Sequence, residues 1–211
     1  QRTALQALEN AGVKIEVFAA DVSKPEDVTQ LLAQTSNLRG VVHAAGVLDD
    51  GMLMHQSPKR FLKVAGPKVS GAWNLHIQTK DLPLDFFVLF SSVASIIGSP
   101  GQSNYAAANA FMDGLAHHRK HQGLVATSIN WGPWSDVGMA ASDVVLQRLM
   151  KDGWQPMNAS QGCDFIGHLL KVCKLPQAAV LPIDWGQFAT SIPGAINWNI
   201  LSYLCLLYTS P

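Results

Sequence analysis

The chain has 211 residues, 48% of them hydrophobic and 14% charged, so it can bury one sizeable core and is too short for two ordinary domains. Its 15 basic residues balance its 15 acidic ones, which disfavours nonspecific binding to nucleic acid or to an anionic membrane. The longest apolar stretch, residues 200–208, is much shorter than the roughly 20 residues that a membrane-spanning helix needs, and the first residues show no signal-peptide pattern.

Helical and strand patterns alternate along most of the chain. They predict helices over residues 1–11, from 23 onward, from 57 to a loop at 81–83, and over 103–121, 145–150 and 163–172. They predict strands over residues 13–19, 40–45, 86–90, 125–131 and 178–183. Such alternation is typical of an α/β fold with a doubly wound parallel sheet of the Rossmann type. The tail from about residue 199 shows neither period.

Local signals mark where several of these elements start and end. Gly12 stops the first helix, and residues 23–26, Ser-Lys-Pro-Glu, form a capping box at the start of the second. Residues 86–90 are apolar without a break, as expected of a strand whose two faces are both covered. We therefore expect helices on both sides of the sheet.

Three polar residues stand where an open α/β sheet places its ligands. Ser92 follows the strand at 86–90, at the carboxyl edge of the predicted sheet. Tyr105 and Asn109 lie four residues apart and so share one face of the next helix. The order of serine, tyrosine and polar residue resembles the signature of short-chain dehydrogenase/reductases, although that family usually has lysine at the position of Asn109.

The departure at Asn109 resembles one branch of that family, the ketoreductase domains of polyketide synthases and animal-type fatty acid synthases. These domains keep asparagine after the tyrosine and carry lysine on the preceding helix, and Lys68 lies in the matching segment, residues 66–76. Further segments match in order at residues 21–23, 43–50, 90–95, 101–105, 130–134, 138–140 and 180–185. The resemblance covers residues 1–188.

This resemblance implies reduction of a ketone with a hydride from NADPH and a proton from the protein. Tyr105 would donate the proton, and the ammonium of Lys68 would lower the pKa of Tyr105 and reach the nicotinamide ribose. Ser92 would hydrogen-bond the substrate oxygen, and Asn109 would hold Lys68 in place. Taken singly, each of these residues also fits a plain structural role as a cap, a packed side chain or a surface charge.

The resemblance also assigns contacts with NADPH, at the adenine, at a turn of small residues beside the cofactor, and at the nicotinamide. In chain order these residues are Asp21, Val22, Ala44, Ala45, Gly46, Lys68, Tyr105, Gly132, Pro133 and Trp134.

Two features of the sequence predict the stereochemistry of reduction. The segment Leu48-Asp49-Asp50 resembles the motif of B-type polyketide ketoreductases, which are expected to give the 3R hydroxyl. The tryptophan that marks the opposite type would stand eight residues before Tyr105, at the position that Ile97 holds. Both features favour the B type.

The resemblance implies parts that these 211 residues do not carry. They hold no GxGxxG phosphate-binding loop, so we expect the fold to lack its first βαβ segment and the chain alone to bind NADPH poorly and to be marginally stable. We divide it into a partial ketoreductase domain, residues 1–190, and a linker or non-native tail, residues 191–211. The implied partners are a β-ketoacyl chain on acyl carrier protein and the other domains of the same synthase.

Two other functions fit part of the pattern. A free-standing short-chain reductase of a small ketone would share the fold, but Asn109 and the displaced Lys68 argue against it. A ketoreductase-like domain kept as a structural part of a synthase would have no turnover. Such domains commonly lose one of the reacting residues, whereas Ser92, Tyr105 and Lys68 are all present.

The histidines and cysteines fit structural roles. His117 and His121 share a helix face but lie at its C-terminal end, where the helix dipole favours histidine, so we expect no metal site. His43 is expected to pack at a strand end. The three cysteines form no CxxC pair, which favours reduced thiols in the cytoplasm or an organelle. Cys163 and Cys173 are expected to be small buried residues.

Overall fold

A computed structural model of the protein describes residues 2–136, 143–172 and 174–191 and contains a four-stranded parallel sheet. The strands are β1 (Gly40–His43), β2 (Phe86–Ser92), β3 (Thr127–Trp131) and β4 (Gln177–Val180). They lie in sequence order across the sheet, and all three pairings are parallel. The predicted Rossmann-like α/β fold is therefore confirmed.

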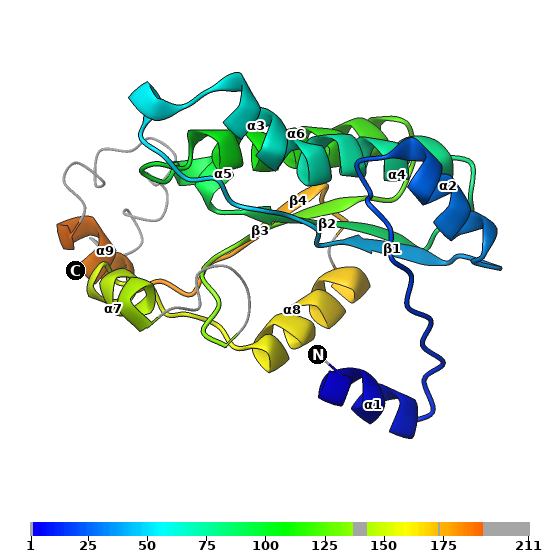
Figure 1. The fold of residues 1–211 in the computed structure, drawn as a ribbon. Helices are drawn as coiled ribbons and strands as arrows, with labels where there is room; N and C mark the ends of the chain where they lie inside the picture. Colours follow the sequence, from blue (N-terminus) through cyan, green and yellow to red (C-terminus); the bar gives the residue numbers. More distant parts are fainter. Residues whose placement is uncertain (1, 137–142, 173, 192–211) are drawn as a thin grey trace.

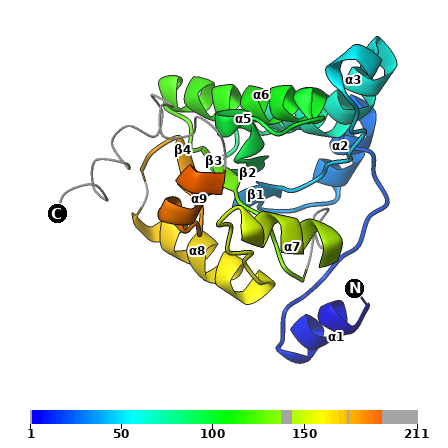
Figure 2. The ribbon, with the colours of Figure 1, turned by 90° about the vertical axis from the view of Figure 1, so that its left-hand side faces the viewer.

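Helices cover both faces of this sheet (Figures 1 and 2). One face carries α2 (Pro25–Ala33), α3 (Pro58–Ala65), α4 (Gly71–Thr79) and α6 (Ser103–His121). The other carries α8 (Ala159–Val172), with α7 (Asp143–Lys151) nearby. Two short helices, α5 (Ala94–Ile97) and α9 (Trp185–Ser191), were not predicted from the sequence.

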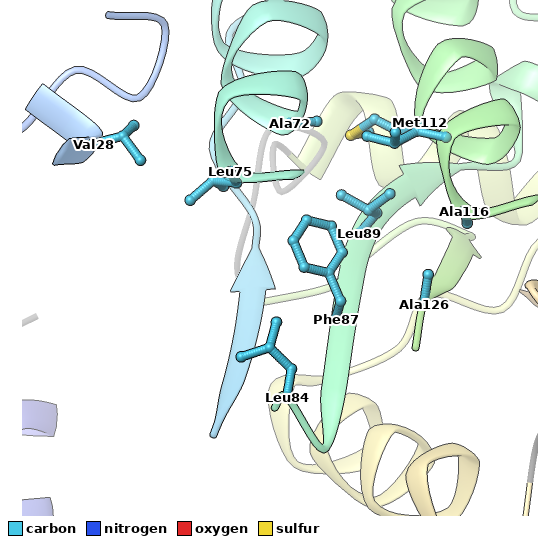
Figure 3. Close-up of a cluster of buried hydrophobic side chains, with 10 residues drawn as sticks. Val28, Ala72, Leu75, Leu84, Phe87, Leu89, Met112, Ala116 and Ala126 are labelled. Carbon is cyan, nitrogen blue, oxygen red and sulfur yellow. The ribbon is translucent and has the colours of Figure 1, made fainter. Parts of the chain in front are cut away.

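The central strand β2 explains why both faces are covered. Its Phe87 and Leu89 point into a core beneath α2, α4 and α6 (Figure 3), whereas Val88 joins a second core beneath α8. All three side chains are at most 1% exposed. The unbroken apolar run thus serves two cores, as a strand between two helix layers must.

One predicted strand does not form. Residues 13–19 form no regular secondary structure, and Val17 is 76% exposed. Figure 1 shows this segment running from α1 (Arg2–Asn10) to α2 past the edge strand β1. A strand needs a hydrogen-bonding neighbour, and this segment pairs with none of the four described strands. The β-branched composition of this segment therefore predicted a strand that the structure does not contain.

Smaller predictions also need correction. Ser23 does not cap α2, because its hydroxyl donates to Asp21 and the N-cap position is held by Lys24, whose side chain makes no capping bond. Cys163 is exposed rather than buried, because it lies on the outer side of α8. His43 is buried as expected, with Nε2 3.0 Å from the carbonyl of Pro67. Cys173 and the segments 138–140 and 199–211 lie outside the described residues.

No helix among the described residues is both long and apolar enough to cross a membrane.

Candidate active site

The carboxyl ends of β1, β2 and β3 meet at one edge of the sheet, because the three strands are parallel and adjacent. Ser92 ends β2 directly beside Trp131, the last residue of β3. The segment after β1 carries Ala44 to Gly46, and α6 begins close to the same edge. This is where open α/β sheets bind their ligands.

Lys68 lies at this edge, in an irregular turn between α3 and α4. The predicted long helix is split by a π-helical segment, Gly66–Ser70, a distortion often found at functional sites. Lys68 is only 3% exposed, and its Nζ donates to the carbonyl of Phe90 and to Oδ1 of Asn109, both at 3.0 Å. Burial lowers its pKa from 10.5 to about 8, although Asp113 acts in the opposite direction.

Tyr105 lies in the first turn of α6, with its ring beneath the ammonium of Lys68 at 5.2 Å from Nζ to the ring centroid. Burial raises the pKa of Tyr105, and Asp50 adds to the rise, whereas hydrogen bonding to Ser92 and Asn109 opposes it. The net shift is upward, against the lowering expected from the sequence, because burial of the phenol outweighs the interactions that favour the phenolate. The phenol is therefore held in its protonated form.

Asn109 connects the two preceding residues. It is fully buried, its Oδ1 accepts from Lys68, and its Nδ2 donates to the backbone carbonyl of Tyr105 at 2.8 Å. One amide side chain thus fixes Lys68 against the helix that carries Tyr105. With Lys68 in place, a lysine at position 109 would put a second cation in the same buried space, which is costly.

Ser92 makes a bond to the backbone of α5 and a hydrogen bond to Tyr105. Its Oγ accepts the backbone N–H of Ala94, the first residue of α5, at 3.2 Å. Its carbonyl accepts from Ser95 Oγ at 2.8 Å. A hydroxyl that accepts one bond keeps its own hydrogen for donation, and Ser92 hydrogen-bonds Tyr105, so it can donate to an oxygen beside the phenol.

The turn after β1 lies against Lys68. A Cβ added at Gly46 would stand 3.0 Å from Cε of Lys68, so a side chain there would press on the lysine. Ala44 is exposed and Ala45 half-buried. The structure therefore brings the small-residue turn and the lysine together, as a site for an extended ligand would require.

The other segments assigned to the cofactor are placed differently. Asp21 is exposed, and its carboxylate accepts from the backbone N–H and the hydroxyl of Ser23 at 3.0 and 2.7 Å, which lowers its pKa. The carbonyl of Val22 accepts from Asn74 Nδ2 at 3.0 Å, which ties this loop to α4. Asp21 thus lies before α2 with a negative charge open to solvent.

The segment after β3 is buried against the end of β4. Gly132 donates its N–H to the carbonyl of Val180 at 3.0 Å, and the carbonyl of Pro133 accepts from the N–H of Met157. Trp134 packs on Trp131 with a centroid separation of 4.9 Å. This segment forms one wall of the edge where Ser92 ends.

The acidic pair in the Leu48-Asp49-Asp50 segment is fastened to two helices. Asp49 forms ion pairs with Arg60 and Lys63 of α3, at 3.0 and 3.1 Å. Asp50 accepts from Gln102, just before α6, at 2.9 Å. The motif is thereby held next to the helix end that carries Tyr105.

Ile97 and Leu48 are not bonded to the elements around Tyr105 as the acidic pair is. Ile97 packs against the cluster formed by Trp154 and Phe188, at the end of α5. Leu48 is half-buried in the loop after β1. Of the residues predicted to control stereochemistry, only the acidic pair is directly bonded to the elements around Tyr105.

Sequence reasoning missed several residues that support the site. Arg60 holds Asp49, Asn104 donates from Nδ2 to the Asp49 carbonyl at 2.8 Å, and Asp113 influences Lys68. One signal was available for Asp113, because it stands four residues after Asn109 and so shares its helix face. Arg60 and Asn104 had no comparable signal.

Comparison with known proteins shows the family to which this fold belongs. The model of the KR domain family matches residues 1–136. The chain belongs to the ketoreductase domain family of polyketide synthases. It is 43% identical over 200 residues to polyketide synthase GfsA of Streptomyces halstedii. The alignment covers 93% of this chain and 3% of that protein. The ketoreductase chain therefore spans a small part of the curated relatives that it matches.

Solved structures show the same relationship. An A-type ketoreductase from a modular polyketide synthase has a TM-score of 0.84 and 38% identity, over 90% of this chain and 41% of that one. A C2-type ketoreductase from a modular synthase has a TM-score of 0.79 and 28% identity, over 87% and 40%. Similar structures thus include different stereochemical types.

Proposed function

We propose that this ketoreductase chain carries the reacting residues of an NADPH-dependent β-ketoacyl reductase. The substrate would be a β-ketoacyl chain on acyl carrier protein, and the product a β-hydroxyacyl thioester. The observation that carries the proposal is the cluster of Tyr105, Ser92, Lys68 and Asn109 at the carboxyl edge of the sheet. A proton donor, a hydroxyl and a buried cation in one place fit the reduction of a carbonyl.

The residues at this edge fit a nicotinamide cofactor. The small-residue turn at Ala44 to Gly46 leaves the backbone open beside Lys68, and the buried ammonium supplies a donor for a ribose hydroxyl. When bound, NADPH supplies the hydride. The segments at Asp21 and Gly132 would border its two ends.

Tyr105 supplies the proton in this mechanism. As a hydride reached the carbonyl carbon and the C=O π pair moved to oxygen, the phenolic proton of Tyr105 would pass to that oxygen to give the alcohol. The raised pKa of Tyr105 keeps the proton in place before reaction. Lys68 then stabilises the phenolate with its positive charge, while Ser92 donates a hydrogen bond to the substrate oxygen.

We infer B-type stereochemistry, with a 3R product, from the Leu48-Asp49-Asp50 motif and from Ile97 in place of tryptophan. The ion pairs of Asp49 with Arg60 and Lys63 support a fixed role for this segment beside Tyr105. Chiral analysis of the alcohol formed from a β-ketoacyl thioester tests the inference. A predominantly 3S product would contradict it.

We also propose that residues 1–190 act as part of a ketoreductase domain and that 191–211 form a linker or a non-native tail. The partners would be acyl carrier protein and the other domains of the same synthase. The curated relatives are much longer than the 211 residues and include polyketide synthases, which supports a multidomain setting.

The decisive experiment measures NADPH oxidation by the full-length polypeptide with acetoacetyl-N-acetylcysteamine thioester. The unmodified protein should turn over, and Tyr105→Phe should lose activity while it retains its circular dichroism spectrum and NADPH binding. Gly114→Ala is the matched control on the same helix, because nothing lies within 4 Å of the added methyl. A folded, NADPH-binding protein without turnover would favour the structural role, and an active Tyr105→Phe variant would remove Tyr105 as the proton donor.

A further inference from the structure

A buried carboxylate lies behind the reacting residues. Asp113, two turns after Tyr105 on α6, is 8% exposed. Its Oδ1 accepts from Ser128 at 2.5 Å, and its Oδ2 accepts from Ser95 at 2.6 Å and from Asn130 at 2.9 Å. None of the ion pairs found among the described residues includes it. A buried anion without an ion-pair partner is costly, so a compensating charge is expected nearby.

A chain of hydrogen bonds connects this carboxylate to Lys68. Asn130 Nδ2, which donates to Asp113, also lies 3.1 Å from Ser91 Oγ. Ser91 Oγ donates to the carbonyl of Asn109 at 3.3 Å, and Oδ1 of the same asparagine accepts from Lys68. Ser91, Asn109 and Asn130 are all buried. Two opposite charges are therefore linked through polar groups in a space that excludes water, where electrostatic interactions are strong.

The other titratable groups around Lys68 do not supply a negative charge. His43 of β1 has a pKa lowered to about 4 by burial and by Lys68, so it is neutral at working pH. Tyr105 has a raised pKa and stays protonated. Asp113 is the group whose charge favours the ammonium of Lys68 against the effect of burial.

We propose that Asp113 is a positioning residue of the reductase site, which keeps the side chain of Lys68 as an ammonium through the network of Asn130, Ser91 and Asn109. This inference rests on the proposed function, because the charge of Lys68 matters only if Tyr105 transfers a proton. Asp113 itself touches neither substrate nor cofactor in this scheme. Its contribution is to maintain the charge that stabilises the phenolate.

The consequence is a specific pH dependence. The pKa of Lys68 is about 8, close to working pH, so the fraction of ammonium is sensitive to any nearby charge. Loss of the negative charge at Asp113 should lower the pKa of Lys68 further. The rate of reduction, which needs the ammonium, should then begin to fall at a lower pH. The pKa of Tyr105 is raised, so deprotonation of Tyr105 is not expected to cause the decline near pH 8.

The test is the pH profile of kcat/KM for reduction of acetoacetyl-N-acetylcysteamine thioester by the full-length polypeptide between pH 6 and 10. Asp113→Asn should move the alkaline decline downward by roughly 0.5 to 1 pH unit, less than the roughly 1–3 units of an opposite charge in direct contact, because Asp113 is joined to Lys68 through intervening polar groups. The KM values should change by less than about twofold, because the binding groups remain in place.

Ser128→Ala is the matched control, since it removes a hydrogen bond to the same carboxylate but leaves the charge. Its alkaline decline should stay at the pH of the unmodified protein. If Asp113→Asn does not fold, the exchange Asp113→Asn with Asn130→Asp moves the anion one residue along the network. This double variant should decline at or above the pH of the unmodified protein.

The outcomes separate the two proposals. Turnover with the same alkaline decline in Asp113→Asn and in the unmodified protein would overturn the role of Asp113 and leave the reductase function standing. An equal downward movement in Ser128→Ala would also overturn it, because a structural disturbance would then suffice. No turnover by the folded, NADPH-binding unmodified protein would overturn the proposed function itself.

Discussion

Replacing Lys68 by methionine should change how the stability of the protein depends on pH. Lys68 is 3% exposed, and burial lowers its pKa from 10.5 to about 8. Between these pH values the unfolded chain binds more protons than the folded chain, so the free energy of unfolding rises with pH. Below about pH 8 the full penalty of burying the ammonium is present.

The expected magnitude follows from the same two pKa values. With about 1.4 kcal/mol for each pH unit of difference, Lys68 should add about 2 kcal/mol to the free energy of unfolding between pH 7 and 9.5. Lys68→Met keeps a similar side-chain length and removes the titrating group, so this part of the pH dependence should disappear. Because the variant lacks the ammonium, it should also fail to reduce the β-ketoacyl substrate.

Urea denaturation followed by tryptophan fluorescence measures this difference at pH 7 and at pH 9.5. Lys63→Met is the matched control, because the Lys63 side chain is 58% exposed and should behave like the unmodified protein in this test. The reasoning would be refuted if the unmodified protein and Lys68→Met gained the same stability between the two pH values. It would also fail if the unmodified protein lost stability relative to Lys68→Met.

Three further substitutions test the site and the core. Gly46→Ala should weaken NADPH binding about tenfold, because its methyl would stand 3.0 Å from Cε of Lys68 and such overpacking costs about 1–3 kcal/mol; a fluorescence titration measures this, and unchanged affinity would contradict it. Leu89→Ala should lower the free energy of unfolding by about 2–5 kcal/mol, since Leu89 is fully buried; urea denaturation showing a loss below about 1 kcal/mol would argue against that packing. Arg60→Ala should reduce the 3R excess by releasing Asp49, and chiral chromatography with an unchanged ratio would remove this ion pair from stereocontrol.

The fold was predictable where its signals are local. The apolar run at 86–90 indicated a strand covered on both faces, and Phe87 and Val88 do pack into two different cores. The spacing of Tyr105 and Asn109 indicated a shared helix face, and the two residues are hydrogen-bonded within α6. Periodicity reports such features because it depends only on neighbours along the chain.

Local composition misled where a distant partner decides the structure. Residues 13–19 have the composition of a strand, but they pair with none of the described strands. Cys163 belongs to a residue type that is usually buried, but its side of α8 faces outward. In both cases the outcome depends on which surface the rest of the chain offers.

The sequence by itself determined the alternating α/β order and, through its resemblance to ketoreductases, predicted Tyr105, Ser92 and Lys68 as the set that we propose to react. Only the tertiary structure decided how that set is supported. The bond from Lys68 to Asn109 spans 41 positions, and the network at Asp113 joins α5, α6 and β3. Such contacts have no period in the sequence, because they exist only once packing has brought separate elements together and removed water from between them.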